Sequence, residues 1–180
     1  PTKNSKFAHL QWTMCVTVVM NIDDHLIDQA GKDWPNLLAD WSTALPPAFT
    51  VWLVNRFGDV FAVFDDGSVH KLDVGLGTVD RVADSRDHFC EQLDNADKAN
   101  NWMMIPLVDQ CVSAELNLTH DQCYGYRFPP SLGGEYTVEN VVPISLREHY
   151  SSLADLYRQT KDLPDGTRVK LVVTNLPTGG

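Results

Sequence analysis

The pattern of apolar and polar positions along this chain predicts short helices and hairpin strands in alternation. Residues 22–31 form an amphipathic stretch that Gly31 would close as a short helix. Four apolar residues then recur at i, i+3, i+4 and i+7, the spacing of one helical face: Trp34, Leu37, Leu38 and Trp41. The apolar residues 49–55 are compatible with either a strand or a buried helical turn.

A hairpin is the clearest element that follows. Residues 59–64 and 68–74 flank Asp66-Gly67, and Asp-Gly between two apolar runs is a strong short-range hairpin signal. Gly75 and Gly77 then predict a loop that leads from this hairpin into a helix.

The next expected helix is capped by Asp84 or Ser85 and runs to about residue 100. Its inward-facing residues are Val82, Phe89 and Leu93. A further helix is expected over 103–116, broken or started at Pro106.

Near the end of the chain, residues 145–148 (Ser-Leu-Arg-Glu) are a capping box, which predicts a helix to about residue 160. Asp165-Gly166 then turns the chain into a last strand over 168–174, whose apolar residues alternate.

Residues 123–140 (Cys-Tyr-Gly-Tyr-Arg-Phe-Pro-Pro-Ser-Leu-Gly-Gly-Glu-Tyr-Thr-Val-Glu-Asn) are the most informative stretch of the chain. We expect an aromatic strand over 124–128 and a second strand over 136–143. Nothing in the stretch has the character of a nucleophile or a metal cage. It is typical of a rigid display surface.

Two dipeptides shape the connection between these strands. Pro129 and Pro130 fix φ and remove two backbone donors, so the first strand must end there or lie on an edge. Gly133 and Gly134 allow the positive φ that a tight reversal needs.

Strands grouped in hairpins and separated by helices, without a regular βαβ rhythm, predict an α+β fold. We expect a single domain over 21–175, with a largely antiparallel sheet and helices packed on it. Residues 176–180 are a loose tail. Residues 1–20 are interpreted as an N-terminal extension, either non-native sequence or an additional strand over 14–20.

The charge balance is the unusual part of the composition. Fourteen Lys and Arg face 24 Asp and Glu, a net charge of −10, and residues 1–20 contain two of the bases and no acid. A field of this sign repels phosphate backbones and attracts basic proteins. Direct nucleic-acid binding is therefore disfavoured and a cationic protein partner is favoured, although solubility alone also explains an acidic surface.

The four cysteines form no C-x-x-C pair, and no Cys or His cluster has zinc-finger spacing. Cys90 and Cys111 fall in apolar helical patterns and are expected to be buried thiols. A reducing, cytoplasmic compartment is the simplest interpretation. No stretch approaches the ~20 apolar residues that a membrane span needs.

An enzyme is the least favoured class. The six histidines are scattered, and no nucleophile elbow, P-loop or dinucleotide fingerprint occurs, so we expect no catalytic residue, no metal and no cofactor. The nearest candidate is His120 with Cys123, which a turn histidine and a structural cysteine explain more simply. A small-molecule or regulatory binding module is the alternative, with Trp34, Trp41 and Trp52 lining its pocket.

Several motifs occur in the order seen in a known family: Gly58-Asp59, Asp66-Gly67-Ser68-Val69, residues 72–77, Ala83-Asp84-Ser85, residues 123–140 and Leu163-Pro164-Asp165-Gly166. The series resembles the C-terminal domain of bacterial immunity proteins that neutralise DNase effectors of type VI secretion, over roughly residues 34–173. Its Pro-Pro-x-Leu-Gly-Gly-x-Tyr part is also similar to a motif of SMI1/KNR4-like immunity proteins.

The resemblance implies a protein that binds and occludes a cognate antibacterial toxin, with a basic nuclease-type effector as its partner. It implies no catalytic residues. An inhibitor of this kind would occupy a DNA-binding groove with carboxylates, which agrees with the acidic composition. The oligomeric state is left open.

Seven residues are candidates for partner binding. They are Asp65, Asp66, Asp84, Asp87, Glu91, Tyr126 and Glu135. The simpler explanations are turn chemistry for Asp65 and Asp66, and a solvated helix face for the run of acids over 80–97.

Seven further residues are expected to shape the structure rather than to bind. They are Gly67, Pro129, Pro130, Gly133, Gly134, Tyr136 and Asn140. Tyr124 and Tyr136 are expected in the core, Tyr126 is left open between core and interface, and Asn140 is expected to bond backbone in its loop.

Overall fold

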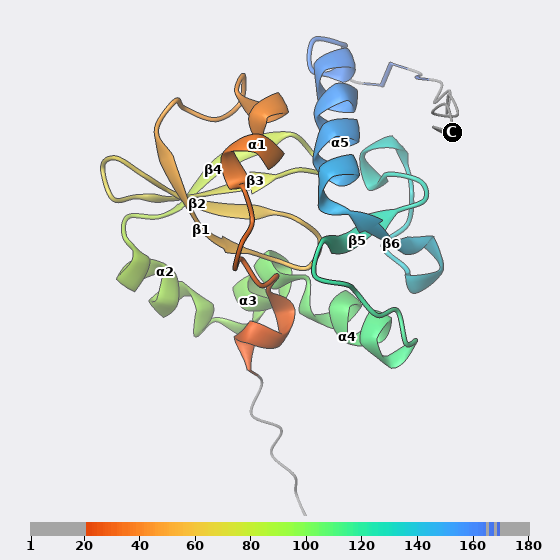
Figure 1. The fold of residues 1–180 in the computed structure, drawn as a ribbon, viewed down its shortest axis with the longest axis horizontal. Helices are drawn as coiled ribbons and strands as arrows, with labels where there is room; N and C mark the ends of the chain where they lie inside the picture. Colours follow the sequence, from red (N-terminus) through yellow and green to blue (C-terminus); the bar gives the residue numbers. More distant parts are fainter. Residues whose placement is uncertain (1–20, 165, 168, 170–180) are drawn as a thin grey trace, which may run out of the picture.

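The fold was analysed in a computed structural model, which describes residues 21–164, 166–167 and 169. The expected extension over 1–20, the last strand over 168–174 and the tail over 176–180 lie outside the described residues, apart from Val169. Within them the chain has the predicted α+β architecture, with a four-stranded and a two-stranded antiparallel sheet (Figure 1).

The larger sheet is a meander in which each strand pairs with the next. Its strands are β1 (Phe49–Val54), β2 (Val60–Phe64), β3 (Val69–Asp73) and β4 (Thr78–Ala83). The β2–β3 hairpin has the predicted turn, in which Gly67 adopts φ +82°. The smaller sheet pairs β5 (Gln122–Tyr126) with β6 (Val141–Ser145).

The helices are short apart from the last. They are α1 (Trp34–Leu37), α2 (Arg86–Leu93), α3 (Ala96–Met103), α4 (Ile105–Ser113) and α5 (Leu146–Thr160), with 3₁₀ turns η1 (Ile22–His25), η2 (Ala39–Trp41), η3 (Pro130–Leu132) and η4 (Val138–Asn140). Ser145 caps α5 as predicted, since its hydroxyl accepts from the Glu148 amide at 3.2 Å.

Both faces of the larger sheet are covered, because its strands alternate between two apolar clusters. Val60 and Ala62 of β2 pack in a cluster with residues of α1, η2 and α5, whereas Phe61 packs in a cluster with residues of α2 and α3. The sheet is therefore the middle of three layers, with α1 and α5 on one side and α2 and α3 on the other (Figure 1).

Trp34, Trp41 and Trp52 belong to the apolar clusters of the core and do not line the cleft described below. Trp41 is fully buried, stacks on Tyr157 of α5 and donates its indole N–H to the Tyr150 carbonyl at 3.2 Å. Trp52 packs edge-on against Phe89 on the opposite side of the sheet. The alternative in which these indoles line a ligand pocket is wrong.

Helix α5 is anchored to the β1–β2 loop by two buried polar side chains. His149 Nε2 lies 3.0 Å from the Phe57 carbonyl, and the Tyr150 hydroxyl donates to the Gly58 carbonyl at 2.9 Å. Burial lowers the pKa of His149 to about 4, while the bond to the Phe57 carbonyl acts in the opposite direction. His149 is thus neutral at pH 7 and donates through Nε2.

The helix predicted over 22–31 is wrong beyond its first turn. After η1 the chain extends, and Leu26 forms an isolated antiparallel bridge with Asn55. Leu26 and Ile27 join the clusters on opposite sides of the sheet, which is the alternation of a strand. An edge partner for β1 thus outweighed the helical pattern.

The region after the hairpin departs from prediction twice. The glycine loop leads into β4 and not into a helix. Asp80 and Arg81 of β4 are exposed, which is typical of an edge strand. The single helix to residue 100 is two helices, because Asn95 caps α3 by accepting from the Lys98 amide at 3.1 Å.

Further departures concern single positions. The strand predicted over 136–143 begins only at Val141, and Tyr136 is 59% exposed instead of buried. Cys111 is buried as expected, but Cys90 is exposed on the outer face of α2. Among the described residues no helix is long and apolar enough to cross a membrane, and no group of His, Cys, Asp or Glu side chains is arranged to hold a metal.

The buried His149 predicts a pH dependence of stability. The pKa of His149 is about 4 in the fold against 6.5 for the free side chain. Between these pH values the imidazole is protonated in the unfolded chain but not in the folded chain. Stability is therefore lost as pH falls from 6.5 to 4, by about 3 kcal/mol from this group. His149→Gln keeps a donor but does not titrate. Urea unfolding at several pH values should show the wild-type advantage over this variant shrinking towards pH 4, and parallel curves would refute the assignment.

Candidate functional site

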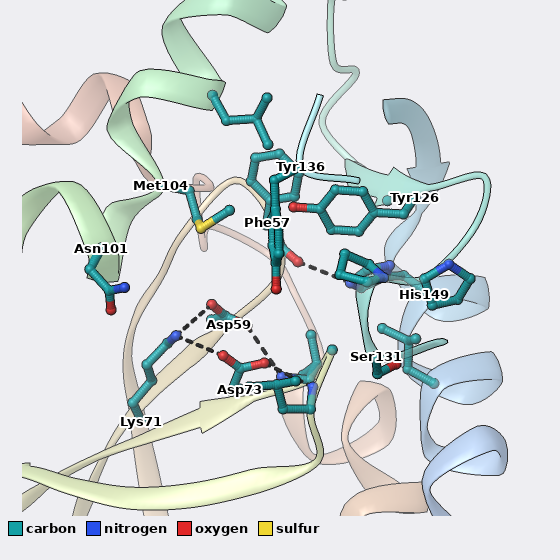
Figure 2. A pocket seen from close by; sticks show the side chains of 18 of the residues that line it. Phe57, Asp59, Lys71, Asp73, Asn101, Met104, Tyr126, Ser131, Tyr136 and His149 are labelled. Atoms are coloured by element: carbon teal, nitrogen blue, oxygen red, sulfur yellow. Dashed lines mark hydrogen bonds and ion pairs between the residues drawn. The ribbon is translucent and has the colours of Figure 1, made fainter. Parts of the chain in front are cut away.

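A cleft opens between the β1–β2 and β3–β4 loops of the main sheet, the α3–α4 segment, the β5–β6 connection and α5 (Figure 2). Its volume is about 780 Å³, within the range of ligand sites in proteins. Its floor carries charged residues, whereas its wall and rim carry aromatic and proline residues. Its lining includes Phe57, Asp59, Lys71, Asp73, Leu76, Asp97, Tyr126, Pro129, Pro130, Tyr136 and His149.

Asn55 organises the loop that carries the floor. Its side-chain oxygen accepts from the amides of Phe57 and Asp59, both at 3.0 Å. Its amide group donates to Asp59 Oδ2 at 3.1 Å and to the Trp102 carbonyl at 2.8 Å. One fully buried side chain therefore closes the β1–β2 loop and ties it to α3.

Lys71 lies between two carboxylates on the floor. Its ammonium is 3.0 Å from Asp59 Oδ2 and 3.0 Å from Asp73 Oδ2. Burial alone would lower the pKa of Lys71, but the two carboxylates raise it above its ordinary value, so the side chain stays charged. The pair with Asp59 joins β3 to the end of the β1–β2 loop, whereas Asp73 is the last residue of β3 itself (Figure 2).

Asp59 is held as a carboxylate by its donors. Burial raises its pKa and the Lys71 ammonium opposes that effect. Its Oδ1 accepts from the Val74 amide at 3.2 Å, while Oδ2 accepts from Asn55 and Lys71. Three donors around two oxygens provide no acceptor for a carboxyl proton, so the ionised form fits this geometry.

The wall is a row of three aromatic rings. Phe57 stacks on Tyr126 with centroids 5.3 Å apart, and Tyr126 meets Tyr136 edge-on at 5.7 Å. The Tyr126 hydroxyl is buried, and none of the described residues bonds to it. Burial raises the pKa of Tyr126, so its hydroxyl keeps its proton at pH 7.

Asn140 holds the rim in place. Its side-chain oxygen accepts from the Phe128 amide at 3.0 Å, and its amide group donates to the Phe128 and Glu135 carbonyls at 2.9 and 2.8 Å. A side chain at Gly134 would collide with the Phe128 carbonyl, so the loop can close only with glycine there. The connection is longer than the tight reversal expected at Gly133-Gly134, because it contains η3 and η4, and of the two glycines only Gly133 has a positive φ.

The acids named from the sequence lie in two places. Asp66 and Asp84 share Arg81, at 3.8 and 2.9 Å, which brings the hairpin turn beside the start of α2. We call the exposed residues Asp65, Asp66, Asp84, Asp87 and Glu91 the tip surface. Tyr126 lines the cleft instead, and Glu135 is exposed on the rim loop beside Tyr136.

The tip surface also has structural duties that favour the simpler explanations. Hydrogen bonds from the Ser68 hydroxyl and amide lower the pKa of Asp66, which is ordinary turn chemistry. Ser85, and not Asp84, caps α2 by accepting from the His88 amide at 3.1 Å. Both carboxylates nevertheless remain exposed at 60% and 73% of their side-chain surface.

Residues 83–157 match the family model described as "T6SS immunity protein Tdi1, C-terminal". The matched segment runs from the end of β4 into α5 and includes α2, the rim loop and the aromatic strand β5. It supports the resemblance seen in the sequence as far as type VI secretion immunity is concerned.

No curated protein matches the chain. A solved structure, "Crystal structure of Atu4351 from Agrobacterium tumefaciens", is 18% identical with a TM-score of 0.46. The similarity covers 67% of this chain and 61% of that one, so the chain spans less than two thirds of that protein's length.

The ion pair between Lys71 and Asp59 on the floor should contribute measurably to the free energy of unfolding. Lys71→Met leaves the buried Asp59 carboxylate without its cation and should cost about 3–5 kcal/mol. Adding Asp59→Asn should recover part of that loss, because the uncompensated charge is removed. Urea unfolding of both single variants and the double variant measures the coupling, with the exposed Lys161→Met as control. A loss below about 1 kcal/mol for Lys71→Met would contradict the arrangement.

The hydrogen bonds of Asn140 in the rim should also contribute to the free energy of unfolding. Asn140→Asp keeps the acceptor for the Phe128 amide but turns a carboxylate oxygen towards two carbonyl oxygens, and should cost about 1–2 kcal/mol. Asn117→Asp adds the same charge at an exposed side chain and serves as control. Unfolding and hydrogen exchange at the Phe128 amide provide the measurement. Equal effects of the two substitutions would contradict a structural role for Asn140.

Proposed function

We propose that this chain is an immunity protein that binds a type VI secretion effector and blocks it stoichiometrically. The observation that carries the proposal is the family match over residues 83–157. The segment it covers contains much of the cleft wall and the helical part of the tip surface. Binding requires neither a catalytic residue nor a cofactor.

The effector we propose is a basic, nuclease-type toxin, bound in the cytoplasm where such a toxin would reach DNA. Support comes from charge: the chain carries a net −10, and a protein that holds DNA must present cations. Complementary fields of this kind raise association rates by about 10–10³. Carboxylates placed in the groove would then exclude DNA.

The tip surface is the proposed region of first contact. Asp66 and Asp84 share only one guanidinium between them, and Asp87 and Glu91 add two exposed charges on α2. The local surplus of negative charge therefore survives the ion pairs. Exposed charges of this type act mainly on association rates, and salt screens them.

A small-molecule binding module is the second candidate. The cleft supports it, because a partly enclosed volume with aromatic walls and a few convergent polar groups is the usual form of a ligand site. A thermal-shift screen with small metabolites would favour this function if a compound stabilised the protein and no effector bound.

Co-expression with a panel of type VI DNase effector domains tests the proposal. One effector should be neutralised and should co-purify as a one-to-one complex that weakens at high salt. If cells survive none of the effectors when this protein is co-expressed, or if an effector is bound but stays active, the proposal is contradicted.

Charge reversal then maps the contact. Asp66→Lys with Asp84→Lys should lower the association rate constant at least about tenfold at low salt, with a smaller difference at high salt. Asp155→Lys with Asp162→Lys makes the same change in net charge at the end of α5 and is the control. Equal rates for the two double variants would rule out the tip surface.

A further inference from the structure

We propose that the cleft receives an arginine or lysine side chain from a protruding segment of the effector and anchors the complex there. The inference rests on the proposed function and names the site and the chemistry of its occupant. Three features of the cleft carry it: an apolar rim, an aromatic wall and a surplus of carboxylates beneath them (Figure 2).

The rim indicates a protein partner. Tyr136 is 59% exposed and Leu76 is 55% exposed, more than any other large hydrophobic side chain of the described residues. They come from two different loops, and both line this cleft. Apolar side chains at the mouth of a pocket are typical of protein interfaces, where aromatic residues dominate the binding energy.

The wall suits a cation. The rings of Phe57, Tyr126 and Tyr136 stand in contact along one side, and a ring face attracts an ammonium or guanidinium group. The buried Tyr126 hydroxyl, to which no described residue bonds, offers one further hydrogen bond. A flat guanidinium can stack on a tyrosine and use several donors at once.

The charged residues that line the cleft also favour a positively charged occupant. Asp59, Asp73 and Asp97 line the cleft, and Lys71 is the cation among its lining residues. His149 is neutral, so a surplus of two negative charges faces the space. Asp97 enters no ion pair within the described part of the chain, which leaves it for a partner. This surplus of negative charge would repel an anionic group.

The cleft and the tip surface would have different effects on the complex. Exposed carboxylates at the tip act over a distance and change the rate of association. A side chain held in a partly buried aromatic cleft is lost only when the complex separates, so it changes the rate of dissociation. The two surfaces can therefore be tested separately.

The first test uses the effector that the wild-type protein neutralises. Tyr136→Ala and Asp97→Asn should each raise the dissociation rate constant about tenfold or more, and Tyr136→Phe, which keeps the ring, should remain close to wild type. Phe128→Ala and Asp94→Asn are matched controls, because both residues are exposed and lie outside the cleft. If the cleft variants bind like these controls while the effector is still neutralised, the cleft proposal fails and the proposed function stands.

The second test needs no effector. N-acetyl-arginine amide should shift the NMR signals of Tyr126, Tyr136 and the His149 ring in a saturable way, whereas the neutral citrulline analogue should not. Asp97→Asn should weaken the arginine effect severalfold. Equal shifts with arginine and citrulline, or shifts confined to the tip surface, would overturn the proposal. Arginine binding in the cleft without neutralisation of any effector would instead refute the proposed function alone.

Discussion

The structure depends on the burial of one carboxylate, Asp59, because an ionised group that is only 6% exposed must be surrounded by donors. Asn55 and Lys71 provide them from two sides, and the Val74 amide provides a third. Satisfying Asp59 therefore fixes the β1–β2 loop and the end of β3 in one arrangement. The carbonyls of that loop then anchor α5 through its buried histidine and tyrosine. The main sheet and the C-terminal helix are thus positioned by the same polar cluster.

The same cluster explains why the cleft is already formed without a partner. Its floor cannot move without breaking the buried ion pair between Asp59 and Lys71. Its rim is closed by the hydrogen bonds of Asn140 and the close packing at Gly134. Gly58 has a related role, because a side chain there would lie 2.9 Å from the His149 ring. A site held this firmly loses little conformational freedom when it binds, so more of the contact energy remains as affinity. The cost of building it falls on folding, not on recognition.

Local signals predicted the hairpin, the α5 cap and the fold class, since each depends on residues close together in the chain. The floor of the cleft could have been found in the same way. A hairpin centred on Asp66 places Asp59 opposite Asp73, and two carboxylates facing each other require a cation such as Lys71. Tyr136 could not be placed, because its exposure depends on a loop closed by Asn140. Likewise, Leu26 became an edge partner through a contact with Asn55, which no local pattern encodes.

The two acidic surfaces differ in how far their charges act. At the tip, Asp66 and Asp84 lie in water and are screened within about 8 Å at physiological ionic strength. In the cleft, Lys71 neutralises part of the charge but leaves a surplus next to aromatic rings, where water competes less. A net charge of −10 would draw any basic protein to this chain. Under the proposed function, discrimination among basic partners would come from the cleft, whose shape, unbonded tyrosine hydroxyl and surplus of negative charge together restrict what can enter.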